Sequence, residues 1–320
     1  MPQDILTYSK IAHIVWLSIH IVQSWCQHKV FASESEAITF FQENENIIHA
    51  KPFIKWVGWK RQLIAQFQEL FPKEFNNYHE PFLGGWAVFF NIQKKQSFLS
   101  DVNGELINLY QVVQNYPQEL IAFLESQEIS KERFLEIRAW DREEKYLTEY
   151  SIIERAGRFI YLNRLGFNGL YRVNGQGFFN VPYGKYTNPD IVQRDNILAA
   201  SELLRKTGAI IKHQSFEEVL KNAQKWDFVY FDPPYDTLSE TANFTSYVKE
   251  DCGKELQYQL AEVCKKLHKK WVLFMLSNHN TPLIQELYQD FTQHIVKARR
   301  NVNSKGTGRG EIEEIVVVNY

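Results

Sequence analysis

The chain has 320 residues, of which 44% are hydrophobic and 15% aromatic, and its formal net charge is −2 at pH 7. The length is sufficient for one large α/β domain with an inserted lobe, and the composition is typical of a well-packed globular protein. The near-neutral charge excludes a global basic field, so any nucleic-acid-binding surface must be local.

The N-terminal segment 1–50 is predicted to be a helical extension of unknown role. Its apolar stretch, residues 11–25, is too short and too interrupted by polar residues for a membrane span, which needs ~20 apolar residues. The segment also lacks the charged start and small-residue cleavage site of a signal peptide. We therefore expect no membrane association.

The cysteines Cys26, Cys252 and Cys264 are widely separated and show neither metal-ligand spacing nor an evident pairing. We interpret them as reduced thiols of a cytoplasmic protein. We expect no metal site, and we expect a monomer.

The main body begins at 51–63, which leads into a helical pattern through Phe71. Residues 79–90 are predicted to form a strand, a turn and a helix. Further elements are a strand at Ser97–Asp101, a helix at Glu105–Val113, and a mostly helical region at 117–205 interrupted by a loop between Gly166 and Tyr186.

Strand patterns then recur at Ala209–His213, Phe228–Phe231, Trp271–Leu276, His294–Ala298 and Ile312–Val318. The last two flank a basic loop, Arg299–Gly310, which predicts a closing antiparallel hairpin. That loop either clamps phosphates or is simply a mobile surface loop. Strands that alternate with helices predict an α/β fold with a doubly wound sheet.

The strand Phe228–Phe231 ends abruptly at Asp232-Pro233-Pro234-Tyr235, here named the DPPY corner. Its prolines lack backbone donors, so the chain cannot continue in a sheet ladder. An acid, a carbonyl and an aromatic ring are thus presented at the carboxyl end of a strand, where open α/β sheets bind ligands. The alternative is a stiff turn without further function.

The chemistry of this corner suits an exocyclic amine on a nucleobase, which is a poor nucleophile because its lone pair is delocalised. The Asp232 carboxylate and the Pro233 carbonyl can accept its two hydrogens and so aim the lone pair at an electrophile, while Tyr235 stacks on the base. The base must leave a duplex to reach such a corner.

The DPPY corner resembles the catalytic motif of amino-methyltransferases that act on adenine or cytosine in DNA and use S-adenosylmethionine. The segments 55–60 (Lys-Trp-Val-Gly-Trp-Lys) and 80–86 (Glu-Pro-Phe-Leu-Gly-Gly-Trp) resemble the opening motif and the glycine turn of Dam-type, class alpha, D12 family DNA adenine methyltransferases. The resemblance runs from Lys51 to Tyr320. It implies a Rossmann-like S-adenosylmethionine-dependent methyltransferase sheet with an inserted helical and hairpin target-recognition domain.

The resemblance also implies a set of cofactor-binding residues. Asp101, 17 positions beyond Gly84, matches the acid that accepts hydrogen bonds from the ribose hydroxyls. Ser215 and Phe216 would flank the adenine ring. The whole expected set is Trp56, Lys60, Phe82, Gly84, Asp101, Ser215, Phe216 and Asp232.

Two departures from the family pattern fall in the same presumed pocket. Trp59 and Trp86 stand where the family has glycine, in positions where the backbone approaches a ligand or takes a positive φ. Two indoles there would fill the methionine slot of the cofactor. Alternatively, both point outward and have little effect.

The hairpin region carries basic and aromatic residues and no acid between Arg155 and Asn188. Such a face predicts phosphate neutralisation and base stacking; the alternative is a surface hairpin with ordinary aromatic packing. The basic residues are Arg155, Arg158, Arg164, Arg172 and Lys185, and the aromatic ones are Phe167, Tyr171, Phe178, Phe179, Tyr183 and Tyr186.

By resemblance, Arg172 contacts guanine, and the apolar positions Leu170 and Pro182 meet thymine methyl groups. Phe167 and Asn168 would insert into the stack where the adenine has flipped out, and Lys185 completes the DNA-binding set. The implied target is double-stranded DNA at GATC. We expect Asn163 and Asn180 to brace the hairpin.

We therefore predict a catalytic core at 51–103 and 189–320, with a target-recognition domain at 104–188. The leading hypothesis is transfer of a methyl group from S-adenosylmethionine to N6 of adenine in duplex DNA. The alternatives are an RNA base methyltransferase and a DNA-binding protein whose cofactor pocket is blocked. The sequence does not distinguish restriction–modification from replication or phage roles.

Overall fold

The computed structural model describes residues 48, 50–56, 64–85, 88–236, 247–299 and 311–320. The chain divides into two compact units, Met1–His49 and Ala50–Tyr320, and the second is described below. Within the described ranges, no helix combines the length and the apolar character needed to cross a membrane.

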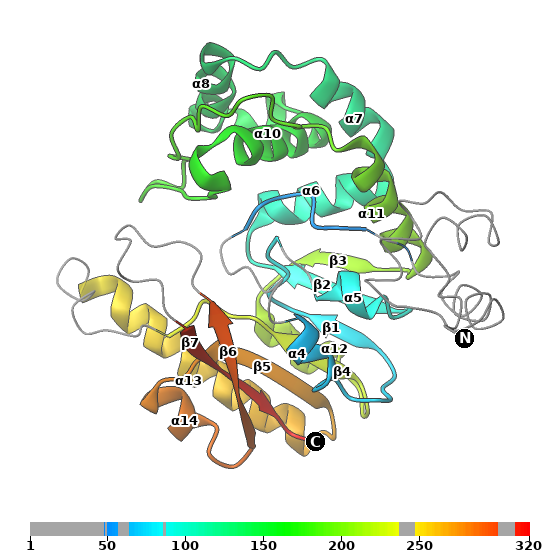
Figure 1. The fold of residues 1–320 in the computed structure, drawn as a ribbon, viewed down its shortest axis with the longest axis vertical. Helices are drawn as coiled ribbons and strands as arrows, with labels where there is room; N and C mark the ends of the chain where they lie inside the picture. The colour runs from blue at the N-terminus through cyan, green and yellow to red at the C-terminus, as the bar shows by residue number, and fades with distance from the viewer. Residues whose placement is uncertain (1–47, 49, 57–63, 86–87, 237–246, 300–310) are drawn as a thin grey trace, which may run out of the picture. The chain divides into compact units, whose positions relative to one another are not determined.

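A seven-stranded sheet forms the centre of this unit, in the order β3-β2-β1-β4-β5-β7-β6 (Figure 1). Neighbouring strands from β3 to β5 pair in parallel, and β7 runs antiparallel to both β5 and β6. The predicted doubly wound sheet and its closing hairpin are confirmed. The strands are β1 (Tyr78–Glu80), β2 (Ser97–Asp101), β3 (Ile210–His213), β4 (Phe228–Phe231), β5 (Leu273–His279), β6 (Thr292–Arg299) and β7 (Glu311–Val318).

The strand order reverses between β1 and β4, because β2 and β3 follow β1 on one side while β4 and β5 lie on the other. In sheets of this kind, ligands bind outside the carboxyl ends of the strands at such a reversal. Glu80 is the last residue of β1, and Asp232 follows β4 directly. The topology therefore brings the glycine turn and the DPPY corner to the same edge of the sheet.

The helices near the sheet are α4 (Ile64–Gln68), α5 (Phe89–Ile92), α6 (Gly104–Asn115), α11 (Arg194–Lys206), α12 (Val219–Asn222), α13 (Tyr247–Lys269) and α14 (Pro282–Leu287). Between α6 and α11 the chain forms α7 (Pro117–Glu125), α8 (Lys131–Ala139), α9 (Tyr146–Glu149) and α10 (Ile152–Leu165). Helix α10 packs on α6, α7 and α8, and α6 also contacts β2 and β3 (Figure 1). The long α6 thus links the sheet to the helices inserted after β2.

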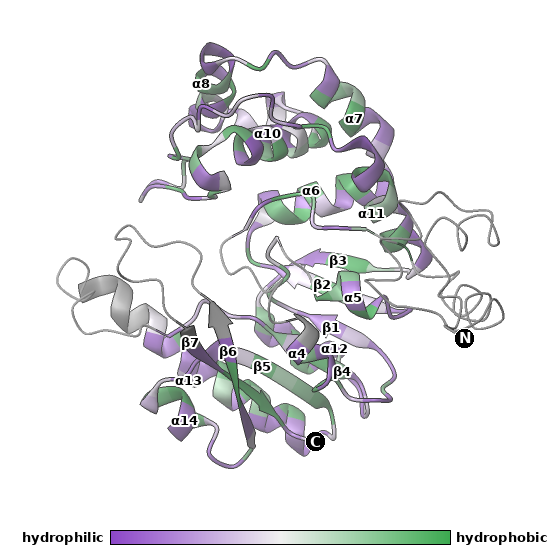
Figure 2. Ribbon diagram, in the orientation of Figure 1, coloured by the Kyte–Doolittle hydropathy of each residue, from purple (hydrophilic) through white to green (hydrophobic). Residues whose placement is uncertain are grey.

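The central strands are buried on both faces, as expected of parallel strands covered by helices. Every residue of β4 is fully buried, and Val229 and Phe231 pack in one core cluster with Leu260 and Cys264 of α13. In Figure 2, β5 is mostly hydrophobic in colour while the helices carry both colours. Uninterrupted apolar runs in the strands and amphipathic helices therefore explain the layered core.

The sequence predicts a strand at Trp271–Leu276, whereas β5 spans Leu273–His279. The predicted strand therefore begins two residues too early and ends three residues too early. Trp271 has φ of +60°, a left-handed conformation that a strand cannot contain. At the other end, the polar residues Ser277, Asn278 and His279 stay in the sheet because each is paired with β7. Hydrophobic patterning alone misses this polar extension.

Gly157 supplies a test of the helical packing. A Cβ on Gly157 would lie 2.1 Å from the Phe123 ring on α7, whereas a Cβ on Gly253 of α13 meets no atom within 4 Å. Gly157→Ala should therefore lower the free energy of unfolding by about 1 kcal/mol or more, since overpacking outweighs the gain in helix propensity. Gly253→Ala should raise that free energy by up to about 1 kcal/mol. Urea unfolding of both variants is the measurement, and a Gly157→Ala protein as stable as the parent would contradict the packing.

Candidate active site

The DPPY corner leaves the sheet at the end of β4. Pro233 is buried and Asp232 is half-buried. The Ser277 hydroxyl donates to the Asp232 carboxylate over 3.2 Å, and the Gln257 side-chain amide donates to the Pro234 carbonyl over 2.8 Å. The carboxylate and the backbone of the corner are therefore both held by side chains from neighbouring elements.

Tyr235, the fourth residue of the corner, is held at its hydroxyl and at its ring. The hydroxyl donates to Glu314 of β7 over 2.9 Å. The ring lies edge-on to the His279 ring, with centroids 4.8 Å apart. These contacts fix the direction of the aromatic face that we expect to stack on a base.

The glycine turn after β1 is tied to the end of β2. Gly84 has φ of +54°, a conformation that favours glycine, and its amide donates to Asp101 Oδ2 over 3.0 Å. The Asn103 amide donates to the other carboxylate oxygen over 2.9 Å. Burial raises the pKa of Asp101 above its ordinary value, although these amides favour the ionised form. Two expected cofactor-binding residues are thus joined directly.

Trp56 packs on this turn, and this packing explains why the second residue of the glycine pair, Gly85, has no side chain. A Cβ on Gly85 would lie only 2.5 Å from Trp56 Cβ, so no larger residue fits there. The indole also stacks near Tyr171 at 5.4 Å and Phe159 at 6.2 Å between ring centroids. Trp56 therefore links the glycine turn to the inserted lobe.

An aromatic pair lies beside the turn. Phe82 and Phe216 stack with ring centroids 5.2 Å apart and planes inclined by 21°. Phe82 follows β1, while Ser215 and Phe216 follow β3, where the Gln214 amide donates to the Asp101 carbonyl. The carboxyl edge of β1 to β4 thus collects six of the expected cofactor residues: Phe82, Gly84, Asp101, Ser215, Phe216 and Asp232.

Trp59, Lys60 and Trp86 lie outside the described residues, as do Cys26, nearly all of the N-terminal segment 1–50, and residues 300–310 of the basic loop. The expected role of Lys60 and the blocked-pocket hypothesis accordingly stay predictions.

Glu80 is a buried acid for which the sequence suggested no role. It accepts hydrogen bonds from the Tyr78 hydroxyl and from the amides of Val88 and Phe89 at the start of α5. Burial raises the pKa of Glu80 to about 8, despite these three donors. The sequence signal for this role is an acid that ends a strand directly before Pro81. Glu80 thus links the end of β1 to the start of α5.

The inserted hairpin presents most of its expected DNA-binding residues to solvent. Phe167, Asn168, Arg172, Pro182 and Lys185 are exposed. The expected base-contacting residue Leu170 is half-buried. All six are described and lie between the end of α10 and the start of α11.

Two asparagines brace this hairpin, as predicted. The Asn163 side chain donates to the Lys55 and Gly169 carbonyls over 2.7 and 2.9 Å. The Asn180 side chain accepts a hydrogen bond from Arg172 Nε over 2.7 Å, and its backbone amide donates to the Arg172 carbonyl over 3.0 Å. Arg172 is therefore exposed yet oriented.

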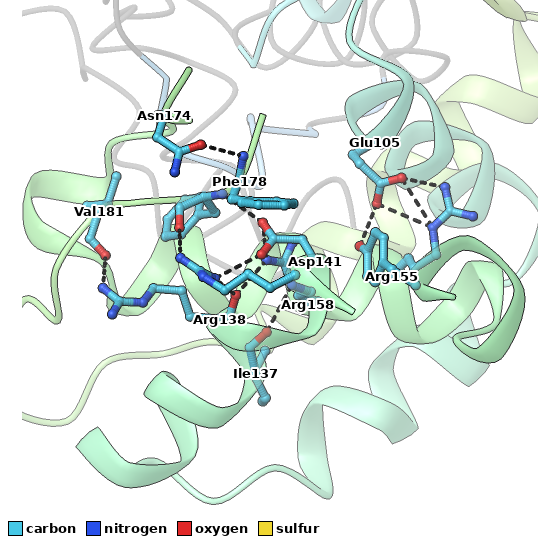
Figure 3. A network of polar contacts seen from close by, with 12 residues as sticks. Glu105, Ile137, Arg138, Asp141, Arg155, Arg158, Asn174, Phe178 and Val181 are labelled. Carbon is cyan, nitrogen blue, oxygen red and sulfur yellow. Dashed lines mark hydrogen bonds and ion pairs between the residues drawn. The ribbon is translucent and has the colours of Figure 1, made fainter. Parts of the chain in front are cut away.

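The prediction of a basic DNA-binding face is wrong for two of its arginines. Arg155 pairs with Glu105, and Arg158 is only 5% exposed and pairs with Asp141 over 2.7 Å (Figure 3). Both acids lie outside the acid-free span, in segments that the fold brings against it. These arginines are neutralised and unavailable to DNA phosphates.

The same network anchors the hairpin. Asp141 Oδ2 accepts the Phe179 amide over 2.7 Å, and Arg142 donates to the Phe179 carbonyl over 3.0 Å. Arg138 donates to the Val181 carbonyl over 3.3 Å (Figure 3). Phe179 is itself buried, so it packs in the lobe and cannot stack on a base. The arginine–aspartate cluster is thus structural.

The sequence is similar to those of known DNA methyltransferases. A model of the D12 class N6 adenine-specific DNA methyltransferase family matches residues 56–302. The type II methyltransferase M1.LlaDCHI of Lactococcus lactis subsp. cremoris is 45% identical over 278 residues, covering 86% of this chain and 98% of that protein. The type II methyltransferase M.MjaIII of Methanocaldococcus jannaschii is 39% identical, covering 85% and 100%. The DNA adenine methylase of Escherichia coli K12 is 34% identical, covering 84% and 95%.

Glu80 makes a prediction about pH. The folded state keeps the Glu80 proton up to about pH 8, whereas an unfolded glutamate loses it near 4.5. The folded state thus binds more protons in this window, so this contribution to stability falls as pH rises, by up to about 1.4 kcal/mol per pH unit. Urea unfolding from pH 5 to 8 should show a flatter profile for Glu80→Gln than for the parent. The exposed Glu69→Gln variant should keep the parental profile, and an unchanged profile in Glu80→Gln would refute the assignment.

Proposed function

This chain belongs to the D12 class of N6 adenine-specific DNA methyltransferases, and from that premise we propose that it methylates flipped adenine at GATC with S-adenosylmethionine as donor. One observation carries the proposal. The DPPY corner after β4 and the Gly84–Asp101 turn after β1 and β2 lie at one edge of the sheet, where the strand order reverses. The expected amine acceptors are therefore close to the expected donor-binding residues.

The corner would act first on the adenine amine. The Asp232 carboxylate and the Pro233 carbonyl would accept the two N6 hydrogens and favour a tetrahedral nitrogen with an available lone pair. No residue that the structure describes donates a hydrogen bond to the Pro233 carbonyl, while the Pro234 carbonyl is already engaged by Gln257. The Asp232 charge would then stabilise the positive charge that develops on nitrogen, and solvent would take the released proton.

The residues at the glycine turn fit S-adenosylmethionine, which supplies an electrophilic methyl group when bound. Asp101 Oδ2 accepts the Gly84 amide and Oδ1 accepts the Asn103 amide, and a carboxylate has further acceptor sites that suit a ribose hydroxyl. The stacked Phe82 and Phe216 rings provide an apolar surface suited to an adenine ring. The Trp56 side chain packs directly against Gly84 and Gly85 of the turn.

The hairpin supplies the proposed sequence readout. Arg172 is held by Asn180 while its guanidinium remains exposed, which suits bidentate contact with guanine O6 and N7. Phe167 is 50% exposed beside Asn168, whose φ of +55° belongs to a tight turn. A projecting aromatic residue on such a turn suits insertion into the base stack. The RNA alternative loses support because the matched family acts on DNA.

Asp232→Ala tests the catalytic proposal. Loss of the carboxylate should lower the single-turnover rate of methyl transfer to a GATC duplex by roughly 10²–10³-fold, with little change in DNA affinity, since the charge develops only in the transition state. Transfer of labelled methyl groups under saturating donor is the measurement. The exposed Asp290→Ala variant should keep the parental rate. Parental transfer by Asp232→Ala would eliminate the corner as the amine-binding site.

Arg172→Ala tests the readout. Removing a bidentate guanine contact should cost ~1–3 kcal/mol of discrimination, which is about a 5- to 150-fold loss of preference for GATC over a duplex with the guanine replaced. Nonspecific, salt-dependent binding should remain largely intact. Competitive binding and methylation on both duplexes measure this. The exposed Arg205→Ala variant serves as the matched control, and unchanged preference in Arg172→Ala would show that another residue reads the guanine.

A further inference from the structure

The strand beside the DPPY corner extends past it. β4 and β5 pair in parallel, with Phe231 opposite Leu276, so the next residue of β5, Ser277, lies alongside Asp232. β4 ends at this point, whereas β5 continues to His279 because β7 pairs with it. Polar side chains at the end of β5 therefore face the chain where it leaves the sheet.

The first of these contacts reaches the carboxylate. Ser277 is fully buried, and its hydroxyl lies 3.2 Å from Asp232 Oδ1 and 3.0 Å from the Tyr230 hydroxyl. Because a serine hydroxyl has a single proton and it goes to the carboxylate, the Tyr230 hydroxyl must donate to Ser277. Burial raises the pKa of Tyr230 well above its ordinary value, so it stays a donor. This directed chain of hydrogen bonds holds one oxygen of the Asp232 carboxylate.

The second contact reaches the backbone through two buried amides. Gln257 of α13 donates to the Pro234 carbonyl over 2.8 Å and accepts a hydrogen bond from Asn278 over 2.9 Å. The Asn278 oxygen accepts the Asp236 amide over 2.9 Å. A backbone carbonyl stands at one end of this chain and a backbone N–H at the other, so neither amide can be reversed. The segment from Pro234 to Asp236 is thus fixed at both ends.

We propose that Ser277 and Gln257 are positioning residues of the methyl-transfer reaction, which hold the two amine acceptors of the DPPY corner in their working orientation. This inference rests on the proposed function, since it assumes that Asp232 and Pro233 receive the amine. Ser277 orients the carboxylate. Gln257, locked by Asn278, occupies the Pro234 carbonyl and so sets the adjoining peptide that carries the Pro233 carbonyl.

The experiment uses Ser277→Ala and Gln257→Leu in the full chain. Each should lower the single-turnover rate of methyl transfer to a GATC duplex by about 10- to 100-fold, because misplacement of reacting groups by an ångström costs about that much. Dissociation constants for S-adenosylmethionine and for the duplex should stay within about threefold of the parental values. A general loss of structure would weaken binding as well, so a lower rate with retained binding indicates a positioning role. Rates are expressed per bound S-adenosylmethionine, which removes unfolded protein from the comparison. Because Ser277→Ala removes only one oxygen atom, it still tests the proposal if the Gln257→Leu protein does not fold.

The matched controls are Ser126→Ala and Gln259→Leu, which carry the same substitutions at exposed positions and should transfer at the parental rate. Parental rates in both test variants, or losses that vanish per bound donor, would overturn the positioning role. The Asp232→Ala variant distinguishes a failure of the positioning inference from a failure of the proposed function. If it is inactive while Ser277→Ala and Gln257→Leu are fully active, only the positioning inference fails; if it is fully active, the proposed function fails.

Discussion

The candidate site depends on one asymmetry between neighbouring strands. The prolines after Phe231 lack the backbone donors that a ladder needs, so β4 must end, while its neighbour β5 is kept in the sheet by β7. The chain that leaves β4 therefore passes polar side chains on the strand that remains. The Pro-Pro turn is thereby braced at the Asp232 carboxylate and at the Pro234 carbonyl.

A few contacts made by Lys55 and Trp56 join the glycine turn to the inserted lobe. Trp56 packs against Gly85 on one side and lies near Tyr171 on the other, and the preceding Lys55 backbone is bound by Asn163 of α10. The residues proposed to hold the donor and those proposed to read DNA thus share a common segment. At this point the sheet and the inserted lobe therefore meet through packed side chains and hydrogen bonds.

Much of this could be predicted from the sequence, because it depends on local patterns. The apolar runs fix β2 and β4 at their observed bounds, and glycine and proline mark the turns at Gly84 and Asp232. What the sequence could not show depends on partners distant in the chain. Asp141 and Glu105 neutralise arginines that look free in their own segment, and pairing with β7 keeps polar residues within β5. The role of Glu80 was missed for a different reason: two of its three donors are backbone amides of nearby residues, and a backbone amide leaves no mark in the residue type.

The contact between Gly85 and Trp56 limits how this edge can be redesigned. The space that a side chain at position 85 would need is already filled by an indole, so that position tolerates no enlargement without displacing Trp56. Libraries aimed at accepting bulkier sulfonium reagents should therefore leave this pair of residues unchanged.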